Sequence, residues 1–131
     1  MWIYKGEEYN EPGDNYGFVY IITNLTNDRK YIGKKFFWTT KRKTVNKKKK
    51  KVKVESDWKK YWSSSAELIK DIEELGENNF KREIIHLCKS KGVTNYLEAK
   101  EQFLRTVLED NKKWYNGIIN VRVNKTHIRL L

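Results

Sequence analysis

Two strand-like segments on either side of a short turn constrain the fold of this chain more than any other stretch. Residues 17–23 (GFVYIIT) are apolar, β-branched or aromatic, and residues 29–37 resume this character after the sequence NLTND. Asn and Asp favour turns, whereas β-branched and aromatic residues favour strands. The pattern predicts a β-hairpin, and the remaining elements have to pack against it.

The length of the loop decides which side chains of this hairpin share a face. Tyr20 and Tyr31 share one with either a two-residue or a four-residue loop, but not with three residues, because strand side chains alternate. Gly33 lies on the same face, and a glycine within a strand often marks a close approach to the backbone. With Lys34 and Lys35 beside it, this face is typical of a phosphate site, although cross-strand tyrosine pairs often only pack.

Positive charge is concentrated in one segment. The chain has 28 Lys and Arg against 17 Asp and Glu, a net charge of +11. Residues 41–53 hold nine of these cations and no acid, so the other residues carry 19 cations and 17 acids, or +2. Such a segment attracts a polyanion in a salt-dependent way. It is compatible with a basic hairpin that turns near Asn46, or with a solvated, disordered loop.

A single domain over residues 1–131 is predicted, because the length suits one domain and no linker-like segment occurs. We interpret residues 1–16 as an N-terminal arm whose aromatic side chains pack on the domain, and residues 41–54 as a basic insertion. No signal peptide or membrane-length apolar run is found, and Cys88 is the only cysteine. A reduced, cytoplasmic setting is therefore expected.

A helix and a further strand are predicted after the basic segment. Ser64 and Glu67 have the spacing of a capping box, which predicts a helix from this point to Gly76. Residues 80–88 have the composition of a strand. His86 lies within this strand, where a histidine is more simply a structural residue than a general base.

A second helix is predicted from Asn95 as N-cap to about Glu109. Its expected apolar face contains Leu97, Leu104 and Leu108. Glu101 lies at the edge of this face, where a carboxylate is either an ordinary rim glutamate or a ligand for a hard divalent cation. After this helix, residues 114–121 contain an Asn-Gly turn followed by a short strand-like run.

Phe18-Val19-Tyr20 and Tyr31-Ile32-Gly33 resemble the paired motifs of the GIY-YIG nuclease superfamily. The second motif matches letter for letter, whereas the first is FVY instead of GIY. YIGKK, the basic insertion, SDWKKYWSSS and YNGIINVRV together are similar to freestanding phage endonucleases of the Seg type. The resemblance covers roughly residues 17–123.

The resemblance implies an α/β fold with a three-stranded, mainly antiparallel sheet flanked by helices. It implies a metal-dependent DNA endonuclease of the phage homing type that uses Mg²⁺ or Mn²⁺ and acts on DNA as a monomer or homodimer, in the host cytoplasm if it is phage-encoded. A structure-selective repair or recombination nuclease and a non-catalytic DNA-binding module are the alternatives. No membrane partner is expected.

The resemblance also implies the site residues. The catalytic candidates are Tyr20, Tyr31, Gly33, Arg42, Glu101 and Asn120, with Glu101 as the metal ligand. The local concentration of positive charge, and not the resemblance, gives the DNA-binding candidates, which are Lys34, Lys35, Lys41, Lys43, Lys47, Lys48, Lys49, Lys50, Lys51 and Lys53. Lys41 competes with Arg42 for the scissile phosphate, and Asn116 is the second choice for the late asparagine of the family. Trp62 stands where some members have a histidine.

In the expected mechanism, Tyr20 orients or deprotonates the attacking water. A free tyrosine has a pKa near 10, so deprotonation needs a nearby cation, such as Lys34 or Lys35, to lower this pKa. Tyr31 supports the water or the phosphate.

Overall fold

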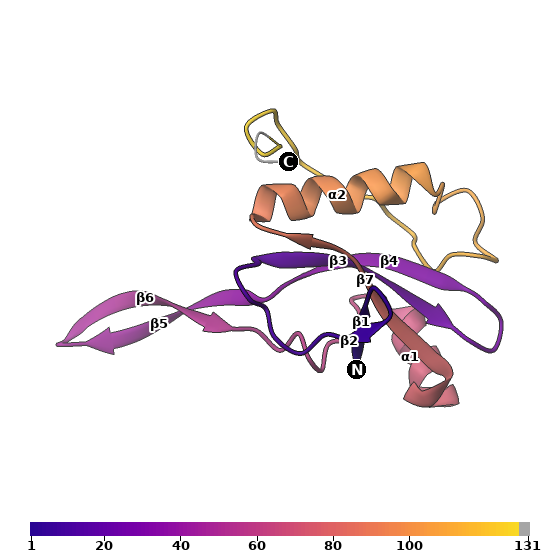
Figure 1. Ribbon diagram of the computed structural model, residues 1–131, viewed down its shortest axis with the longest axis horizontal. Coiled ribbons are helices and arrows are strands. Elements are labelled where there is room, and N and C mark those ends of the chain that lie inside the picture. The colour runs from indigo at the N-terminus through magenta and orange to yellow at the C-terminus, as the bar shows by residue number, and fades with distance from the viewer. Residues whose placement is uncertain (129–131) are drawn as a thin grey trace.

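Strand β3 (Gly17–Asn24) lies at the centre of the structure, and all eight of its residues are buried. The computed structural model describes residues 1–128 and shows β3 between β7 and β4 of a five-stranded sheet (Figure 1). Helix α1 (Ala66–Leu75) packs on one face of this sheet, and helix α2 (Lys91–Leu104) packs on the other. A strand covered on both faces needs a continuous apolar sequence, which residues 17–23 supply.

The strand order of the sheet is β2-β1-β7-β3-β4, with β3 antiparallel to both of its neighbours. The three predicted strands correspond to β3, β4 (Lys30–Phe36) and β7 (Phe80–Cys88), so the α/β class is confirmed. The predicted strand number is wrong, because the N-terminal arm adds β1 (Trp2–Tyr4) and β2 (Glu7–Glu8). Strand β1 pairs in parallel with β7, and this pairing turns the arm into part of the sheet.

The β3–β4 connection is a four-residue loop. This is one of the two loop lengths for which Tyr20 and Tyr31 were predicted to share a face of the hairpin. Tyr20 pairs with Gly33, and Tyr31 pairs with Ile22, so Tyr20 and Tyr31 point to the same face. Asn24 stabilises the loop because its Oδ1 accepts hydrogen bonds from the backbone N and the hydroxyl of Thr26, at 3.0 and 2.6 Å.

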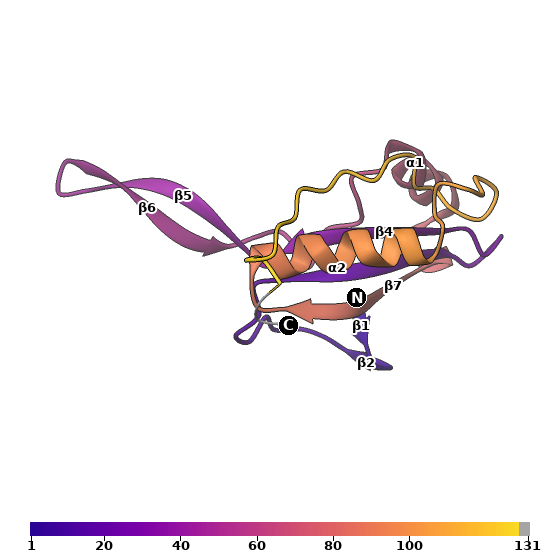
Figure 2. The ribbon, with the colours of Figure 1, turned by 90° about the horizontal axis from the view of Figure 1, so that it is seen from above.

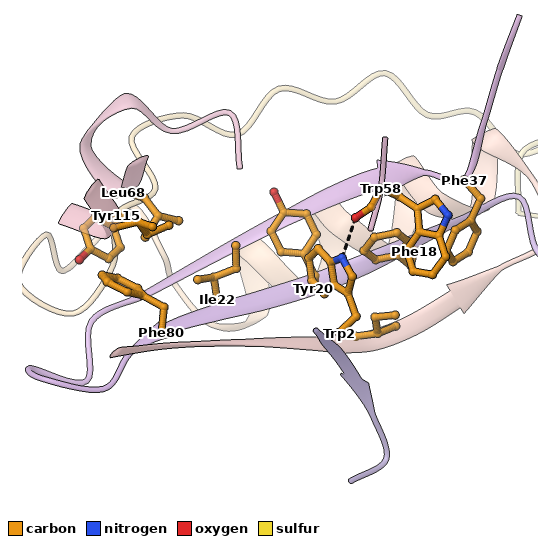
Figure 3. Packing of buried hydrophobic residues seen from close by; sticks show 11 residues of the cluster. Trp2, Phe18, Tyr20, Ile22, Phe37, Trp58, Leu68, Phe80 and Tyr115 are labelled. Carbon is orange, nitrogen blue, oxygen red and sulfur yellow. Dashed lines mark hydrogen bonds between the residues drawn. The ribbon is translucent and has the colours of Figure 1, made fainter. Parts of the chain in front are cut away.

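The side chains of β3 alternate between two apolar clusters. The α1 face receives Phe18, Tyr20 and Ile22, and the α2 face receives Val19 and Ile21. Figure 3 shows the first cluster, in which Trp2 Nε1 donates a hydrogen bond to the Trp58 carbonyl at 2.7 Å. The prediction that aromatic side chains of the arm pack on the domain is therefore confirmed, since Trp2 is buried in this cluster.

Helix α1 ends at Gly76 as predicted, but it begins one residue later than expected. Its N-cap is Ser65, whose Oγ accepts a hydrogen bond from Leu68 N at 3.3 Å. The Ser64–Glu67 capping box is therefore wrong. The Ser64 hydroxyl instead lies 3.3 Å from the Tyr31 hydroxyl. A short 3₁₀ helix, η1 (Glu77–Asn79), connects α1 to β7.

Helix α2 begins earlier and ends earlier than predicted. Its N-cap is Ser90, whose Oγ accepts from Val93 N at 3.1 Å, whereas Asn95 lies inside the helix. The helix ends at Leu104, and Thr106 has a left-handed φ of 53° that turns the chain away.

The apolar face predicted for this helix is confirmed only for Leu97, which packs against the α2-face cluster. Leu104 and Leu108 are exposed, and the residues of the helix that are buried are Val93, Thr94, Ala99 and Gln102. Two of these four are polar. They are accommodated because Thr94 Oγ1 donates to the Ser90 carbonyl and Gln102 Nε2 donates to the Ile32 carbonyl.

The basic segment forms a hairpin of β5 (Trp38–Val45) and β6 (Lys48–Glu55), which is the first of the two predicted alternatives. Asn46 and Lys47 form its turn with φ values of 50° and 63°, as in the type I′ turns that suit two-residue hairpin loops. Figures 1 and 2 show that this hairpin extends away from the sheet and the helices.

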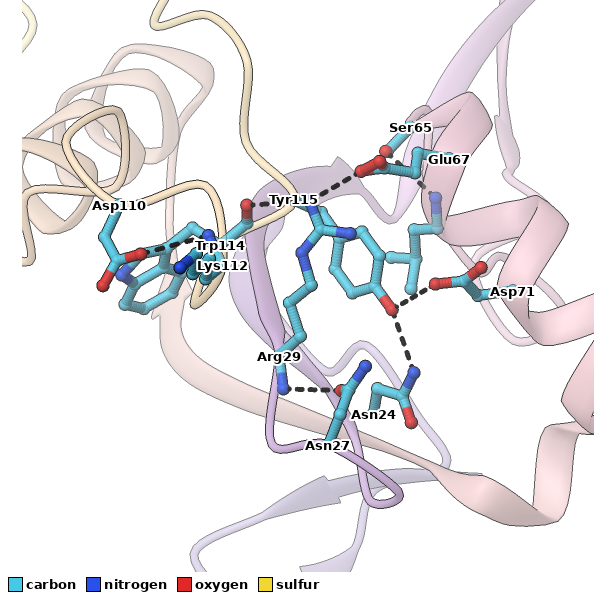
Figure 4. Close-up of polar contacts among 11 residues, drawn as sticks. Asn24, Asn27, Arg29, Ser65, Glu67, Asp71, Asp110, Lys112, Trp114 and Tyr115 are labelled. Carbon is cyan, nitrogen blue, oxygen red and sulfur yellow. Dashed lines mark hydrogen bonds and ion pairs between the residues drawn. The ribbon is translucent and has the colours of Figure 1, made fainter.

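The segment after α2 returns along the sheet without forming the predicted strand-like run. Trp114 makes an isolated bridge with Lys30, and Tyr115 fixes the segment to α1 (Figure 4). The Tyr115 hydroxyl donates to Asp71 Oδ2 at 2.7 Å and accepts from Asn24 Nδ2 at 3.0 Å. The Arg29 guanidinium lies 4.2 Å from the centre of the Tyr115 ring. These contacts hold α1 against the β3–β4 loop. Over residues 1–128, no helix is long and apolar enough to cross a membrane.

Candidate active site

Tyr20 and Tyr31 lie beside each other on the α1 face of the sheet, with ring centroids 6.2 Å apart. Gly33 leaves the space for both rings. A Cβ atom at Gly33 would clash with the Tyr20 hydroxyl and would lie 2.8 Å from Tyr31 Cε1. The predicted close approach to the Gly33 backbone therefore exists, and the approaching groups are the two tyrosines themselves.

The Tyr20 phenol is held in its neutral form. Burial raises its pKa well above the ordinary value, and the neighbouring Tyr61 and Tyr31 raise it further. Lys35 was expected to lower the pKa of Tyr20, but its Nζ pairs with Asp57 Oδ1 at 2.7 Å and lies 4.2 Å from the Tyr61 ring centre. Tyr20 is thus suited to donate a hydrogen bond and not to act as a phenolate base.

Tyr31 is more accessible than Tyr20 and lies nearer the edge of the sheet. Its hydroxyl is 3.3 Å from Ser64 Oγ. Burial raises the pKa of Tyr31, and the negative charge of Glu98 also raises it, although the hydrogen bond with Ser64 acts in the opposite direction.

Glu98 comes from α2, which lies across β3 and β4 (Figure 2). Its side chain is 14 % exposed, and its Oε1 lies 3.8 Å from Lys34 Nζ. Lys34 Nζ also donates to Asn95 Oδ1 at 2.5 Å. Burial raises the pKa of Glu98, and the charge of Lys34 opposes this rise. Lys34, which pairs with Val19, and Glu98 thus lie on the α2 face of β4, whereas Tyr31 lies on the α1 face of the same strand.

Glu101 lies one helical turn further along α2, where both of its carboxylate oxygens have partners. Its Oε1 is 2.9 Å from His86 Nε2, and its Oε2 accepts from Arg105 Nε at 2.9 Å. Burial acts to raise the pKa of Glu101, but the hydrogen bonds with His86 and Arg105 outweigh it, so the pKa is lowered. Glu101 therefore belongs to a separate cluster over β7.

The two candidates for the late asparagine are in different surroundings. Asn116 is buried, its Oδ1 accepts from Ile32 N at 3.0 Å, and its Nδ2 donates to the Ile32 carbonyl at 2.8 Å. The Asn116 amide thus pairs with both backbone groups of Ile32, as the backbone of a neighbouring strand would at the free edge of β4. Ile32 is the residue between Tyr31 and Gly33. Asn120 is exposed.

We expect Asn116→Ala to lower the free energy of unfolding by about 1–3 kcal/mol, because Ile32 N would lose its partner in a buried position. Urea unfolding followed by tryptophan fluorescence measures this change. Asn120→Ala is the matched control and should stay within about 0.5 kcal/mol of the wild type. A larger loss for Asn120→Ala than for Asn116→Ala would contradict this placement of the two residues.

Arg42 and Lys41 lie in the middle of β5, exposed and paired with Lys51 and Val52 of β6. Because the hairpin extends away from the sheet, neither side chain is next to the tyrosines in this structure (Figure 1). The same holds for Lys43 and for Lys47–Lys53 of the hairpin. Of the predicted basic residues, only Lys34 and Lys35 lie on the strand that carries Tyr31.

Glu98 and Tyr61 were not among the predicted site residues. A signal for Glu98 was present, because Thr94, Glu98 and Gln102 form a polar stripe at the i, i+4, i+8 spacing of a helix. Tyr61 lies 6.1 Å from Tyr20 between ring centroids, and its carbonyl accepts from Arg82 Nη1 at 2.6 Å. Arg82 thereby holds residues 59–62 over the tyrosines.

A mixed sheet with a helix on each face, and with paired tyrosines above a strand glycine, defines the class of GIY-YIG nuclease domains. A family model described as "Putative endonuclease segE, GIY-YIG domain" matches residues 2–119. The chain belongs to this family, which confirms the resemblance to the superfamily and to the Seg type. No curated protein and no solved structure gives a significant match.

Proposed function

We propose that this protein is a divalent-metal-dependent endonuclease that hydrolyses phosphodiester bonds of DNA, as a phage homing-type enzyme. The observation that carries the proposal is the arrangement at the β4 edge. There, Tyr31 lies on the α1 face of the strand and Lys34 with Glu98 on its α2 face, in a domain that belongs to an endonuclease family.

Glu98 fits a metal ligand better than Glu101 does. Over residues 1–128, no group of three or more His, Cys, Asp or Glu side chains forms a metal cluster. An ion would therefore bind through one carboxylate together with water and phosphate oxygens, which is common for Mg²⁺. Among residues 1–128, Lys34 is the charged partner of Glu98, whereas Glu101 would have to release His86 and Arg105.

The remaining residues position the reactants. Water attacks the phosphorus and loses a proton to solvent, and the bond to the leaving oxygen breaks as that oxygen takes a proton from solvent. Neutral Tyr31 orients the water or a phosphate oxygen by hydrogen bonding, and the buried Tyr20 packs beside the Tyr31 ring. Lys34 contributes positive charge next to the phosphate. A bound Mg²⁺ or Mn²⁺ supplies further stabilisation of the charge that develops on the phosphate.

A plasmid nicking assay tests the proposal. Supercoiled DNA should be cut with Mg²⁺ or Mn²⁺, and chelation should reduce cutting by at least about 100-fold, since a metal supplies several kcal/mol of stabilisation. DNA binding, measured by fluorescence anisotropy in chelator, should persist. Cutting that is unchanged in chelator would disprove metal dependence, and binding without cutting under all conditions would indicate a DNA-binding module. A parallel assay on a four-way junction separates a homing-type from a structure-selective enzyme.

A further inference from the structure

The β5–β6 hairpin carries its cations on both faces. Strand side chains alternate, and the register pairs Thr40 with Lys53 and Lys43 with Lys50. One face therefore presents Arg42, Lys49, Lys51 and Lys53, and the other presents Lys41, Lys43, Lys48 and Lys50. All eight side chains are exposed. A hairpin that packs on its own domain or on another protein would have one continuous apolar face, and this hairpin has none.

The charge of this hairpin is unfavourable in the free protein. Arg42 stands directly opposite Lys51, and Lys43 stands opposite Lys50. Like charges in such cross-strand positions are destabilising, and a lone two-stranded hairpin is only marginally stable in water. Among residues 1–128, no ion pair reaches a cation of the hairpin, and Glu55 at its base accepts a hydrogen bond from Trp58 Nε1. A polyanion that reaches both faces would relieve this repulsion.

The dimensions of the hairpin match a groove of duplex DNA. Packed sheets lie about 10 Å apart, so one ribbon with its side chains is about 10 Å thick. The major groove is about 12 Å wide and has a row of phosphates along each wall. The minor groove, at about 6 Å, is too narrow. A single strand, or the outer surface of a duplex, would meet only one face of the ribbon.

Given the proposed function, on which this step rests, we propose that the β5–β6 hairpin enters the major groove of duplex DNA. One long edge of the ribbon points to the floor of the groove, and its two faces point to the two walls. The cations of its two faces then contact the phosphates of the two opposite walls. Strand β5 begins two residues after β4 ends, so the groove contact is directly connected to the candidate site. With eight residues in each strand, the ribbon is about 27 Å long and covers about eight base pairs to one side of the cut.

Two triple variants of equal charge test the contact with both walls. Lys49, Lys51 and Lys53 are changed to Gln in the first, and Lys43, Lys48 and Lys50 are changed to Gln in the second. Binding to a 40-base-pair duplex is measured as a function of salt concentration. Each variant should reduce the slope of log K against log salt by roughly 2–3, because each lost phosphate contact contributes about 0.9. If one variant keeps the wild-type slope, only one face contacts DNA, and the proposal is overturned.

The groove itself is tested with modified duplexes. Bulky substituents at C5 of the pyrimidines fill the major groove, and a ligand bound to A·T tracts fills the minor groove. The substituents should weaken wild-type binding at least tenfold, and the minor-groove ligand should leave it unchanged. In a variant with residues 41–52 replaced by Asn-Gly, which joins Thr40 to Lys53 by a two-residue turn, the substituents should have little effect. Competition by the minor-groove ligand alone would overturn the proposal.

Nicking of supercoiled plasmid by the wild-type chain separates this inference from the proposed function. If the wild type binds and cuts while one of the triple variants keeps the wild-type slope, only the placement in the groove fails. If the wild type neither binds nor cuts, the proposed function fails, and the groove inference fails with it.

Discussion

Glu98→Gln should reduce metal-dependent cleavage by at least about 100-fold while changing DNA binding less than threefold. The substitution keeps the shape of the side chain, which is 14 % exposed and packed beside Lys34. It removes the negative charge that a hard cation needs. Single-turnover cleavage at saturating Mg²⁺ measures the first effect, and anisotropy in chelator measures the second.

The matched control is Glu101→Gln, on the same helix and with a similar exposed fraction of 18 %. Its carboxylate holds His86 and Arg105, so its loss should lower stability by about 1–3 kcal/mol and cleavage by less than tenfold at a temperature where the variant is folded. The reverse result, with Glu101→Gln inactive and Glu98→Gln active, would assign the metal to Glu101, as the family resemblance implies.

The tyrosine face of the site was predictable because it depends only on local rules. The alternation of strand side chains and the turn residues after Asn24 place Tyr20, Tyr31 and Gly33 together for either even loop length. The structure selects the four-residue loop, which the sequence had left open. The basic hairpin was one of two alternatives that the sequence left open, and the structure selects it, with its turn at Asn46 and Lys47.

The α2 side of the site depends on where the helix begins, and the sequence offered two competing caps. Ser90 and Asn95 are both good N-cap residues, and Asn95 has Glu98 three residues later as in a capping box. Tertiary contacts select Ser90 as the N-cap. The Asn95 side chain accepts a hydrogen bond from Lys34 Nζ, and Val93, which precedes Asn95, is buried as part of the helix. With Asn95 taken as the cap, the apolar face was predicted to run from Leu97, which does pack on the sheet, to Leu104 and Leu108, which are exposed.

The true contact face of α2 is partly polar, which hydrophobic periodicity does not detect. Thr94 and Gln102 are buried because each of them makes a hydrogen bond with a backbone carbonyl. Asn116 is equally hard to predict, because it is a polar residue that is buried through its hydrogen bonds with Ile32, and hydrophobic periodicity does not mark such a position. Only the structure shows that such residues are buried. Here Gln102 and Asn116 both bind the backbone of Ile32 and so fix the position of β4, the strand that carries Tyr31 and Gly33.

Gly33→Ala should reduce cleavage by roughly 100-fold and the free energy of unfolding by about 1–3 kcal/mol. The added Cβ atom would overlap the Tyr20 hydroxyl and the Tyr31 ring. Tyr20 is fully buried among Trp2, Tyr31 and Tyr61, so its ring has no free space into which to move. The backbone of β4 must then shift, and this shift displaces both hydroxyls. Thermal unfolding and single-turnover cleavage measure the two effects.

Gly117→Ala is the matched glycine control, because a Cβ atom at Gly117 would have no neighbour within 4 Å in the described part of the chain. Its effect on unfolding should be within about 0.5 kcal/mol, and its cleavage rate should equal that of the wild type. If Gly33→Ala behaves like Gly117→Ala, the tyrosine rings do not need the space above Gly33. If Gly33→Ala is stable but inactive, the methyl group blocks the substrate itself, and the glycine contributes access to the backbone instead of room for the rings.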